Sequence, residues 1–141
     1  MLPVEIDGNI CNIFILVRPG VSHFLRKMSK HYELVVFTAS LSKYASPLVD
    51  ILDPEMLCSF KLFREHCTYV NNAFIKDLTK LGRSMTDVII LDNSPVAYMF
   101  QPENAIPILS WYDNQTDREL PRIALILERL AYEEDVRKII R

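Results

Sequence analysis

The chain has 141 residues, half of them hydrophobic, and a formal net charge of −2 at pH 7. This size suits a single domain, residues 1–141, with a substantial core, and the lack of a basic excess argues against direct nucleic-acid binding. No apolar run reaches the ~20 residues of a membrane-spanning helix, and three cysteines without a Cys-x-x-Cys pair favour a reducing, intracellular compartment.

The first predicted element is a β-hairpin. Asp7-Gly8 supplies the positive φ angles of a tight turn between Val4–Ile6 and a second strand at Ile13–Val17. Residues 9–12 would extend that second strand or add a bulge to it. The run Arg18–Gly20 then ends the hairpin, because proline and glycine interrupt strand pairing.

Helices and strands alternate along the rest of the chain. Apolar residues at helical spacing predict helices over Val21–Met28, Leu41–Leu52 and Leu120–Ala131. Apolar runs predict buried core strands at Leu34–Phe37 and Val88–Leu91 and a short edge strand at Ile106–Leu109. Residues 57–75 are predicted to form short strands, and Leu78–Arg83 a short helix. This alternation is typical of an α/β fold, in which helices cover both faces of a parallel sheet.

Asp92 and Asn93 follow the predicted strand Val88–Leu91. Ligands in open α/β sheets bind at the carboxyl ends of the strands. Carboxylate and amide oxygens are the hard donors that Mg²⁺ prefers, yet Asp and Asn are also common turn residues. The pair is therefore either part of a magnesium site or the polar start of a loop.

Other candidate phosphate ligands are Thr38, Ser40 and Lys76. The two hydroxyls follow the strand Leu34–Phe37 and could bind phosphate oxygens, although helix capping by Ser40 or Ser42 is at least as good an interpretation. Lys76 could neutralise a phosphoryl group as a point charge, or simply be solvated.

Two arginines could clamp phosphate or form ordinary ion pairs. From the residues alone the ion-pair interpretation is preferred, with Glu5 as the partner of Arg18 and Glu65 as the partner of Arg64.

The order and spacing of these segments resemble the FCP1-type small C-terminal-domain phosphatase family of the haloacid dehalogenase superfamily, nearest its small-phosphatase-like branch. The matching strings cover nearly the whole chain and include Arg18-Pro19-Gly20-Val21, Phe37-Thr38-Ala39-Ser40, Ile75-Lys76-Asp77-Leu78, Ile90-Leu91-Asp92-Asn93-Ser94-Pro95 and Ser110-Trp111-Tyr112. The resemblance implies a haloacid-dehalogenase-like parallel sheet with flanking helices and a small β insert at about 57–75.

The resemblance also implies a Mg²⁺-dependent protein serine/threonine phosphatase that works through an aspartyl-phosphate. In that scheme Thr38 holds the phosphoryl oxygens, Lys76 neutralises them, and Asp92 and Asn93 bind the metal. Arg64 lies near the peptide substrate, a phosphorylated protein such as the RNA polymerase II C-terminal domain. The implied location is the nucleus, with mitochondrial and cytoplasmic locations left open.

Four apolar residues match positions that form a pocket for a proline-bearing peptide in this family: Val4, Ile6, Ile13 and Leu41. Plain core packing is an equally good interpretation of these side chains.

The 141 residues contain no Asp-x-Asp-x-Thr string. In the family this motif ends the first strand, and its first Asp is the nucleophile. We therefore expect a fold that lacks its first, central strand, between the strands ending at Phe37 and Leu91, and a chain that is inactive alone. The alternatives are a non-catalytic module that binds phosphoproteins or a partner, and a gene product without function.

Overall fold

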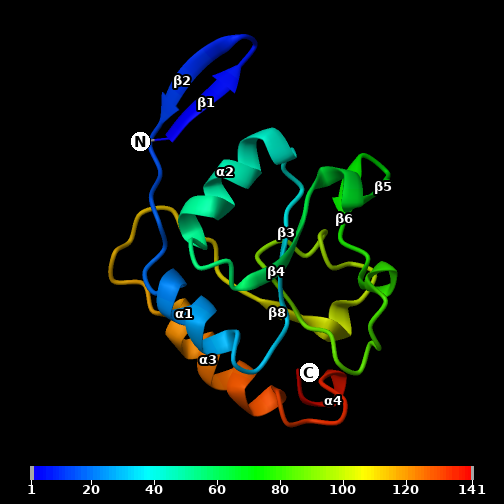
Figure 1. Cartoon of the computed structure of the whole chain (residues 1–141). Coiled ribbons are helices and arrows are strands. Elements are labelled where there is room, and N and C mark those ends of the chain that lie inside the picture. The colour runs from blue at the N-terminus through cyan, green and yellow to red at the C-terminus, as the bar shows by residue number, and fades with distance from the viewer. Residues whose placement is uncertain (1, 141) are drawn as a thin grey trace.

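The computed structural model describes residues 2–140, except the side chains of Leu2, Val4, Ile6, Cys11 and Ile13 (Figure 1). Its strands are β1 (Leu2–Ile6), β2 (Asn9–Ile13), β3 (Leu34–Phe37), β4 (Cys58–Leu62), β5 (Thr68–Val70), β6 (Ala73–Ile75), β7 (Ile90–Asp92) and β8 (Ala105–Pro107). Its α-helices are α1 (Val21–Met28), α2 (Ser42–Leu52), α3 (Glu119–Leu130) and α4 (Arg137–Ile140). Short 3₁₀ turns lie at Arg64–His66, Leu78–Leu81 and Pro102–Asn104.

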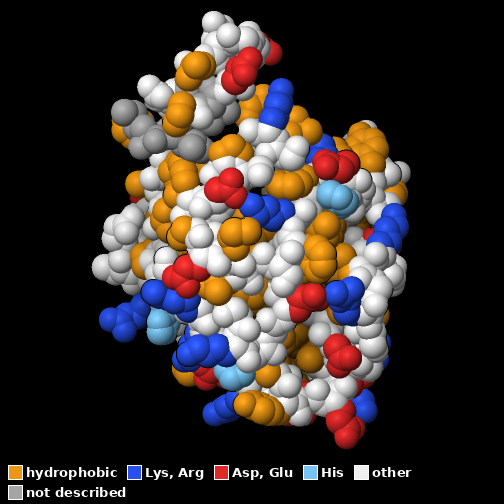
Figure 2. Space-filling view, in the orientation of Figure 1, with side chains coloured by type: hydrophobic (Ala, Val, Ile, Leu, Met, Phe, Trp, Pro, Cys, Tyr) orange, Lys and Arg blue, Asp and Glu red, His pale blue; other side chains and the backbone are white. Residues whose placement is uncertain are grey.

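The N-terminal hairpin projects from the rest of the chain (Figure 1). Asp7 and Gly8 form its turn with φ angles of 50° and 81°, as predicted. The prediction of a second strand at Ile13–Val17 is wrong. β2 spans Asn9–Ile13, so residues 9–12, which were expected to extend the second strand or add a bulge, form most of it, and Leu2 pairs with Ile13. Figure 2 shows exposed hydrophobic side chains on the hairpin. Ile10 of β2 is 78% exposed.

Two parallel strand pairs form the centre of the fold. β3 pairs with β4, and β7 pairs with β8, both in parallel. Within residues 2–140 no backbone ladder joins the first pair to the second. This is the expected α/β fold with its central strand missing. The core strands are consequently less buried than the sequence predicted, because neither β3 nor β7 has a neighbour on its second edge among residues 2–140. Val35 of β3, for example, is 37% exposed.

The segment 57–75 does not form one separate β insert. β4 belongs to the parallel pair with β3, whereas β5 and β6 make an antiparallel hairpin of their own. Asn71 and Asn72 form the turn of this hairpin with positive φ angles, which asparagine tolerates better than most residues. β4 belongs to the central parallel pair because it hydrogen-bonds to β3. The local sequence does not specify this pairing.

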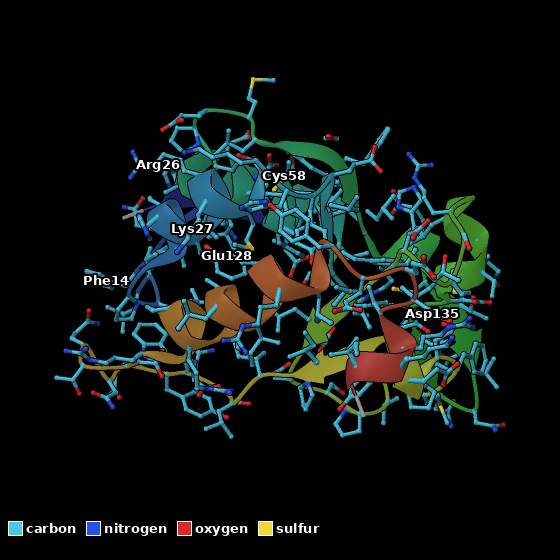
Figure 3. All side chains as sticks on the ribbon, turned by 90° about the horizontal axis from the view of Figure 1, so that it is seen from below. Phe14, Arg26, Lys27, Cys58, Glu128 and Asp135 are labelled. Carbon is cyan, nitrogen blue, oxygen red and sulfur yellow. The ribbon has the colours of Figure 1, made fainter. Side chains whose placement is uncertain are left out.

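A helical layer covers one side of both strand pairs. Met28 of α1 and Ile123, Leu127 and Leu130 of α3 belong to one buried cluster, and their helical spacing is the one predicted. Lys27 of α1 and Glu128 of α3 add an ion pair of 2.7 Å (Figure 3). None of the helices described in residues 2–140 has the length and hydropathy needed to cross a membrane.

Asp53 ends α2 and connects it to β4. Its two carboxylate oxygens accept hydrogen bonds of 2.8 Å from the backbone N–H groups of Leu57 and Cys58. Burial by itself would raise the pKa of Asp53, but these hydrogen bonds and the nearby Lys61 lower it below its usual value. A buried carboxylate thus fixes the turn that leads from the helix into the strand.

Candidate active site

Lys76 and Asp92 lie together at the carboxyl end of β7. Lys76 Nζ is 2.5 Å from Asp92 Oδ2, and both side chains are about nine-tenths buried, with exposures of 11% and 10%. The backbone N–H of Lys76 donates to Ala97 O, and Asp92 Oδ1 accepts from the N–H of Ser94. Backbone hydrogen bonds therefore fix the main chain at Lys76 and the carboxylate of Asp92, and Asp92 in turn holds the ammonium group.

Thr38 follows β3 on the same side of the site. The ring of Phe37 lies 5.9 Å from Lys76 Nζ, so the ends of β3 and β7 approach the same ammonium group. Thr38 Oγ1 accepts a hydrogen bond of 3.1 Å from the backbone N–H of Ser40. The interpretation of Ser40 or Ser42 as a helix cap is wrong, because Leu41 is the N-cap of α2 and makes no side-chain cap bond. The Thr38 hydroxyl can still donate its proton to a phosphate oxygen.

Arg64 reaches back to the loop after β3. Its Nε donates to Ala39 O at 2.7 Å, and its backbone N–H donates to Ser40 O at 3.1 Å. The guanidinium also lies over the ring of Phe74, 4.9 Å from the centroid. It therefore ties the loop to the β5–β6 hairpin, instead of pairing with Glu65.

Cys67 lies in the same region, with its Sγ 3.9 Å from Thr38 O. Burial raises the pKa of this thiol, and the opposing effect of the nearby Lys76 and Arg64 is too small to reverse the shift. Cys67 is thus a protonated thiol at neutral pH and a poor nucleophile.

Asn93 donates from Nδ2 to Ser110 Oγ at 3.0 Å, which leaves its amide oxygen available as a ligand. Asp92 and Asn93 thus offer hard oxygens suited to Mg²⁺, which takes about six oxygen ligands, several of them waters. However, both Asp92 oxygens already accept hydrogen bonds. Within residues 2–140 no group of three His, Cys, Asp or Glu side chains is placed to hold a metal ion. These residues by themselves do not complete a magnesium site.

A cleft of about 450 Å³ lies beside the ion pair. Its walls include Lys76, Leu91 and Asp92 on one side, Leu52 at the end of α2, and Trp111 in the loop after β8. Trp111 Nε1 donates to Asn114 O at 2.6 Å, which folds that loop onto itself. The cleft is mainly apolar, and its charged residues are Lys76, Asp92 and Arg18, which is a common composition for a ligand site.

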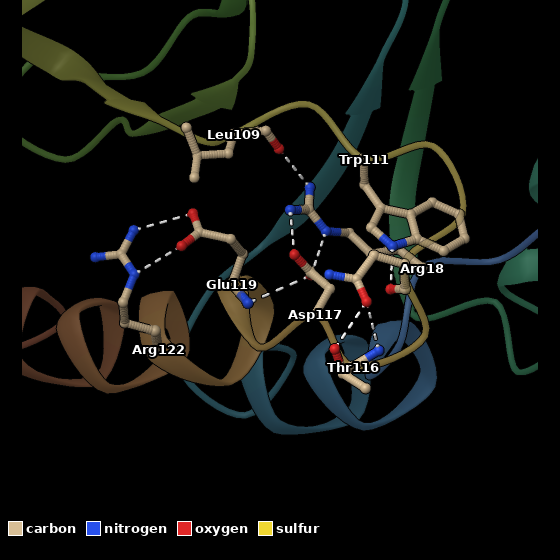
Figure 4. Close-up of polar contacts among 8 residues, drawn as sticks. Arg18, Leu109, Trp111, Thr116, Asp117, Glu119 and Arg122 are labelled. Atoms are coloured by element: carbon tan, nitrogen blue, oxygen red, sulfur yellow. Dashed lines mark hydrogen bonds and ion pairs between the residues drawn. The ribbon is translucent and has the colours of Figure 1, made fainter.

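Arg18 fastens the loop after β8 to the start of α1 (Figure 4). Its Nε and Nη2 donate to the two carboxylate oxygens of Asp117 at 2.7 and 3.1 Å, and its Nη1 donates to Leu109 O at 2.8 Å. Hydrogen bonds from Arg18 hold the pKa of Asp117 below its usual value. Arg18 is thus a structural clamp, and the predicted pairing with Glu5 is wrong.

The predicted peptide pocket falls mostly outside the described side chains. Val4, Ile6 and Ile13 belong to the part of the hairpin whose side chains are not described. Leu41, which is described, is 37% exposed at the start of α2. The assignment of these residues to a peptide pocket stays a prediction.

Gln101 is a site residue that the sequence did not reveal. Its buried side chain donates from Nε2 to Asp77 Oδ1 at 3.0 Å and accepts at Oε1 from the N–H of Leu78 at 2.9 Å. Although burial would raise it, hydrogen bonds from Thr79 and Gln101 lower the pKa of Asp77. This network fixes the turn directly after Lys76. A lone glutamine in a loop carries no pattern from which such a contact could be predicted.

Residues 1–137 match the family model described as "NLI interacting factor-like phosphatase", and the chain belongs to this phosphatase family. It is 48% identical over 136 residues to the "CTD small phosphatase-like protein" of Homo sapiens, a match that covers 96% of this chain and 49% of the relative. It is 45% identical over 141 residues to "Carboxy-terminal domain RNA polymerase II polypeptide A small phosphatase 1" of Homo sapiens, covering all of this chain and 54% of the relative. The chain thus spans about half the length of these curated relatives.

Solved structures support the fold. The fission yeast RNA polymerase II CTD phosphatase Fcp1 aligns with a TM-score of 0.59 at 22% identity, covering 86% of this chain and 38% of that chain. A second Fcp1 structure gives the same TM-score at 26% identity, with 86% and 36% coverage. The predicted membership in the FCP1-type family and the haloacid-dehalogenase-like fold are thereby confirmed.

Proposed function

We propose that this chain is part of a protein serine/threonine phosphatase that dephosphorylates phosphoserine peptides. The observation that carries the proposal is the buried Lys76–Asp92 pair at the end of β7, with the Thr38 loop close by. Phosphoryl transfer depends mainly on positioning and on neutralising the charge of the phosphoryl oxygens. A fixed ammonium group near the end of β3, where Thr38 follows Phe37, would provide both.

Each group has a distinct role in this proposal. Lys76 Nζ neutralises the phosphoryl oxygens, and the Thr38 hydroxyl donates a hydrogen bond to one of them. Asp92 holds the ammonium group in position through their 2.5 Å contact. Arg64, anchored on Ala39 O, directs its remaining N–H groups to the substrate phosphate or peptide. Leu41, with Val4, Ile6 and Ile13 of the hairpin, forms the apolar pocket beside the phosphate.

Mg²⁺, which haloacid-dehalogenase phosphatases generally use, would neutralise further phosphoryl charge when bound. Asp92 and Asn93 would supply two of its oxygen ligands, and the other protein ligands would have to come from outside residues 1–141. The same holds for the nucleophile, since these residues contain no Asp-x-Asp-x-Thr string. We therefore expect residues 1–141 alone to show no turnover.

The names of the relatives suggest the substrate. Three of the curated relatives and the aligned structures are named for the RNA polymerase II C-terminal domain or its phosphatases. We propose that the substrate is a phosphoserine peptide of this kind and that the protein acts inside the cell, in the nucleus. Mitochondrial and cytoplasmic locations are compatible with the same chemistry.

A second candidate function is a binding module without turnover. Residues 1–141 keep the phosphate-binding groups Thr38, Arg64 and Lys76 but contain no nucleophile motif, and this combination favours binding over hydrolysis. Such a module would bind phosphoproteins and leave them intact.

One experiment separates these functions. Residues 1–141 and the same residues with an added N-terminal strand ending in Asp-x-Asp-x-Thr are assayed for Mg²⁺-dependent phosphate release from a phosphoserine peptide. The extended chain should hydrolyse it, and Lys76→Met should lower the rate by about a hundredfold. Lys80→Met, at an exposed lysine that contacts Thr68 Oγ1, is the matched control and should change little. Binding by both chains without hydrolysis supports the binding module, and neither binding nor hydrolysis contradicts both functions.

A further inference from the structure

The outward side of α3 carries a regular row of exposed side chains. The spacing of this row along the sequence alternates between four and three residues, so its members share one side of a helix. We call it the α3 stripe, and its residues, all of them exposed, are Arg118, Arg122, Leu125, Arg129 and Tyr132. Arg118 is the N-cap of α3 and Tyr132 lies just after its C-terminal end, so the stripe extends along the whole helix. The buried side of the same helix packs into the core cluster.

The layer formed by α1 and α3 is basic, although the whole chain has a formal net charge of −2. Residues 21–31 include three Lys or Arg side chains but no Asp or Glu. Figure 2 shows Lys, Arg and His side chains gathered over these two helices. Glu133 and Glu134 follow only after α3 has ended. Positive charge is therefore concentrated on this side of the molecule.

The two carboxylates of α3 leave most of the stripe unneutralised. Glu119 binds Arg122 at 3.0 Å, but the Arg122 side chain stays 55% exposed. Glu128 is occupied by an ion pair of 2.7 Å with α1. Among the described residues 2–140, neither Arg118 nor Arg129 forms an ion pair. The stripe therefore has guanidinium groups available for an acidic partner.

An apolar side chain lies at the centre of this basic stripe. Leu125 is 61% exposed, and its neighbour Ile126 is 39% exposed. Arg122 and Arg129 lie about one helical turn before and after Leu125. An apolar anchor with a guanidinium group on each side is complementary to an apolar side chain flanked by carboxylates.

The spacing of the stripe favours a helix as its occupant. Alternating steps of four and three residues are those of the seam along which a second helix packs at a small crossing angle. A lipid surface would require a broader apolar face than Leu125 and Ile126 provide. A nucleic acid would be bound by the arginines alone and would leave Leu125 without an apolar contact. An acidic helix is the occupant that uses both kinds of side chain.

We propose that the α3 stripe docks an acidic amphipathic helix of a partner protein. Leu125 packs against an apolar residue of that helix, and carboxylates one turn before and after this residue pair with Arg122 and Arg129. The inference goes beyond the proposed phosphatase function, because α3 contributes no residue to the cleft beside Lys76.

The test uses residues 1–141 and a synthetic alanine-rich helical peptide of about 20 residues. The peptide repeats the spacing of the stripe, with Glu where α3 has Arg and Leu where it has Leu125. Calorimetry should show one peptide bound per chain, and the NMR amide signals that shift should belong to α3. A peptide of the same composition, with Glu and Leu distributed around the whole helix, should bind at least about tenfold more weakly.

Charge reversal tests the pairing of the stripe with the peptide. Arg118→Glu/Arg129→Glu should weaken binding of the Glu peptide by about tenfold or more, and a peptide with Lys in place of Glu should bind this variant instead. The matched control is Lys43→Glu/Lys138→Glu, which makes the same change of charge at exposed residues of α2 and α4. Equal weakening in both variants would reduce the effect to net charge and contradict the docking site.

The apolar anchor is tested on its own. Leu125→Ala should weaken binding of the Glu peptide by about tenfold, because the contact with the leucine of the peptide is lost. Ile51→Ala, at a side chain of α2 that is 47% exposed, should change binding little. Thermal melting followed by circular dichroism checks that each variant stays folded.

Other outcomes overturn the proposal. These are the absence of peptide binding, equal binding of the redistributed peptide, and shifted amide signals that lie outside α3. Binding to phosphatidylserine vesicles or to single-stranded RNA, lost in Arg118→Glu/Arg129→Glu but without binding of the peptide, would assign the stripe to a different kind of partner.

Failure of the docking site is distinguishable from failure of the proposed function. In the extended chain of the functional test, Arg118→Glu/Arg129→Glu should leave phosphate release from a short phosphoserine peptide unchanged. Docking of the acidic helix without phosphate release keeps the docking site and contradicts the phosphatase. Phosphate release without docking does the reverse.

Discussion

Lys76 Nζ lies 2.5 Å from Asp92 Oδ2, and this contact joins the loop after β6 to the last residue of β7. Both side chains are largely removed from water, so each charge depends on the other for its stabilisation. A bound phosphoryl group would share the same ammonium group. The pair therefore maintains the geometry of the site as well as its charge.

Removing one member of this pair should destabilise the domain. Lys76→Met leaves the carboxylate of Asp92 buried without its cation, and we expect a loss of about 3 kcal/mol in the free energy of unfolding. The measurement is urea denaturation at neutral pH of residues 1–141 with the added N-terminal strand, called the strand-completed chain below. The double variant Lys76→Met/Asp92→Leu should lose less than the sum of the single variants. Additive losses would show that the two charges do not stabilise each other.

The pKa of Asp135 should depend on Arg137. Arg137 donates from Nε and Nη2 to the two carboxylate oxygens at 2.9 Å and lowers the pKa of Asp135 to about 2. Since the folded pKa lies below the unfolded value, this contribution to stability is complete above about pH 4 and is lost as the pH falls towards 2. In Arg137→Met the pKa should rise towards 3.8, as measured by carboxyl NMR.

The matched control is Arg26→Met, which removes an equal charge from α1, where Arg26 lies 3.8 Å from Glu55. It should leave the titration of Asp135 unchanged. An equal shift in both variants would indicate a general charge effect instead of the local hydrogen bonds.

Asp53 should be far more important for stability than its neighbour Asp50. Asp53→Ala leaves the N–H groups of Leu57 and Cys58 without their acceptor, and we expect a loss of about 2 kcal/mol in the free energy of unfolding. Asp50 makes only a surface ion pair with Lys61, so Asp50→Ala should lose less than about 1 kcal/mol. Urea midpoints of the strand-completed chain compare the two, and similar losses would contradict the capping role.

Arg18 should control the loop that carries Trp111. Arg18→Leu removes the donors to Asp117 and Leu109, and the loop should then detach from the start of α1. Trp111 is the single tryptophan of the chain, so its fluorescence emission should move to longer wavelength as the ring becomes hydrated. Arg122→Leu, which breaks an exposed pair with Glu119 on α3, should leave the emission unchanged. An unchanged emission in Arg18→Leu would show that the loop is held by other contacts.

Local patterns in the sequence determined much of the secondary structure. The apolar spacing of Val21–Met28 and of the last helix was sufficient, because a helix buries one stripe whose period is built into the chain. The Asp7-Gly8 turn and the position of Asp92 at a strand end were predicted for similar local reasons. Family resemblance then brought Thr38, Lys76 and Asp92 into one expected site.

Only the tertiary structure decided which segments pair. β2 runs over Asn9–Ile13 in register with β1, not over Ile13–Val17, and β4 pairs with β3 although its sequence resembles that of any short strand. Arg18 pairs with Asp117, 99 residues away, and Gln101 braces the turn after Lys76. Such contacts depend on the packing of distant segments, and so does the lack of pairing between β3 and β7 within residues 2–140, because no local pattern specifies which strand edges will meet.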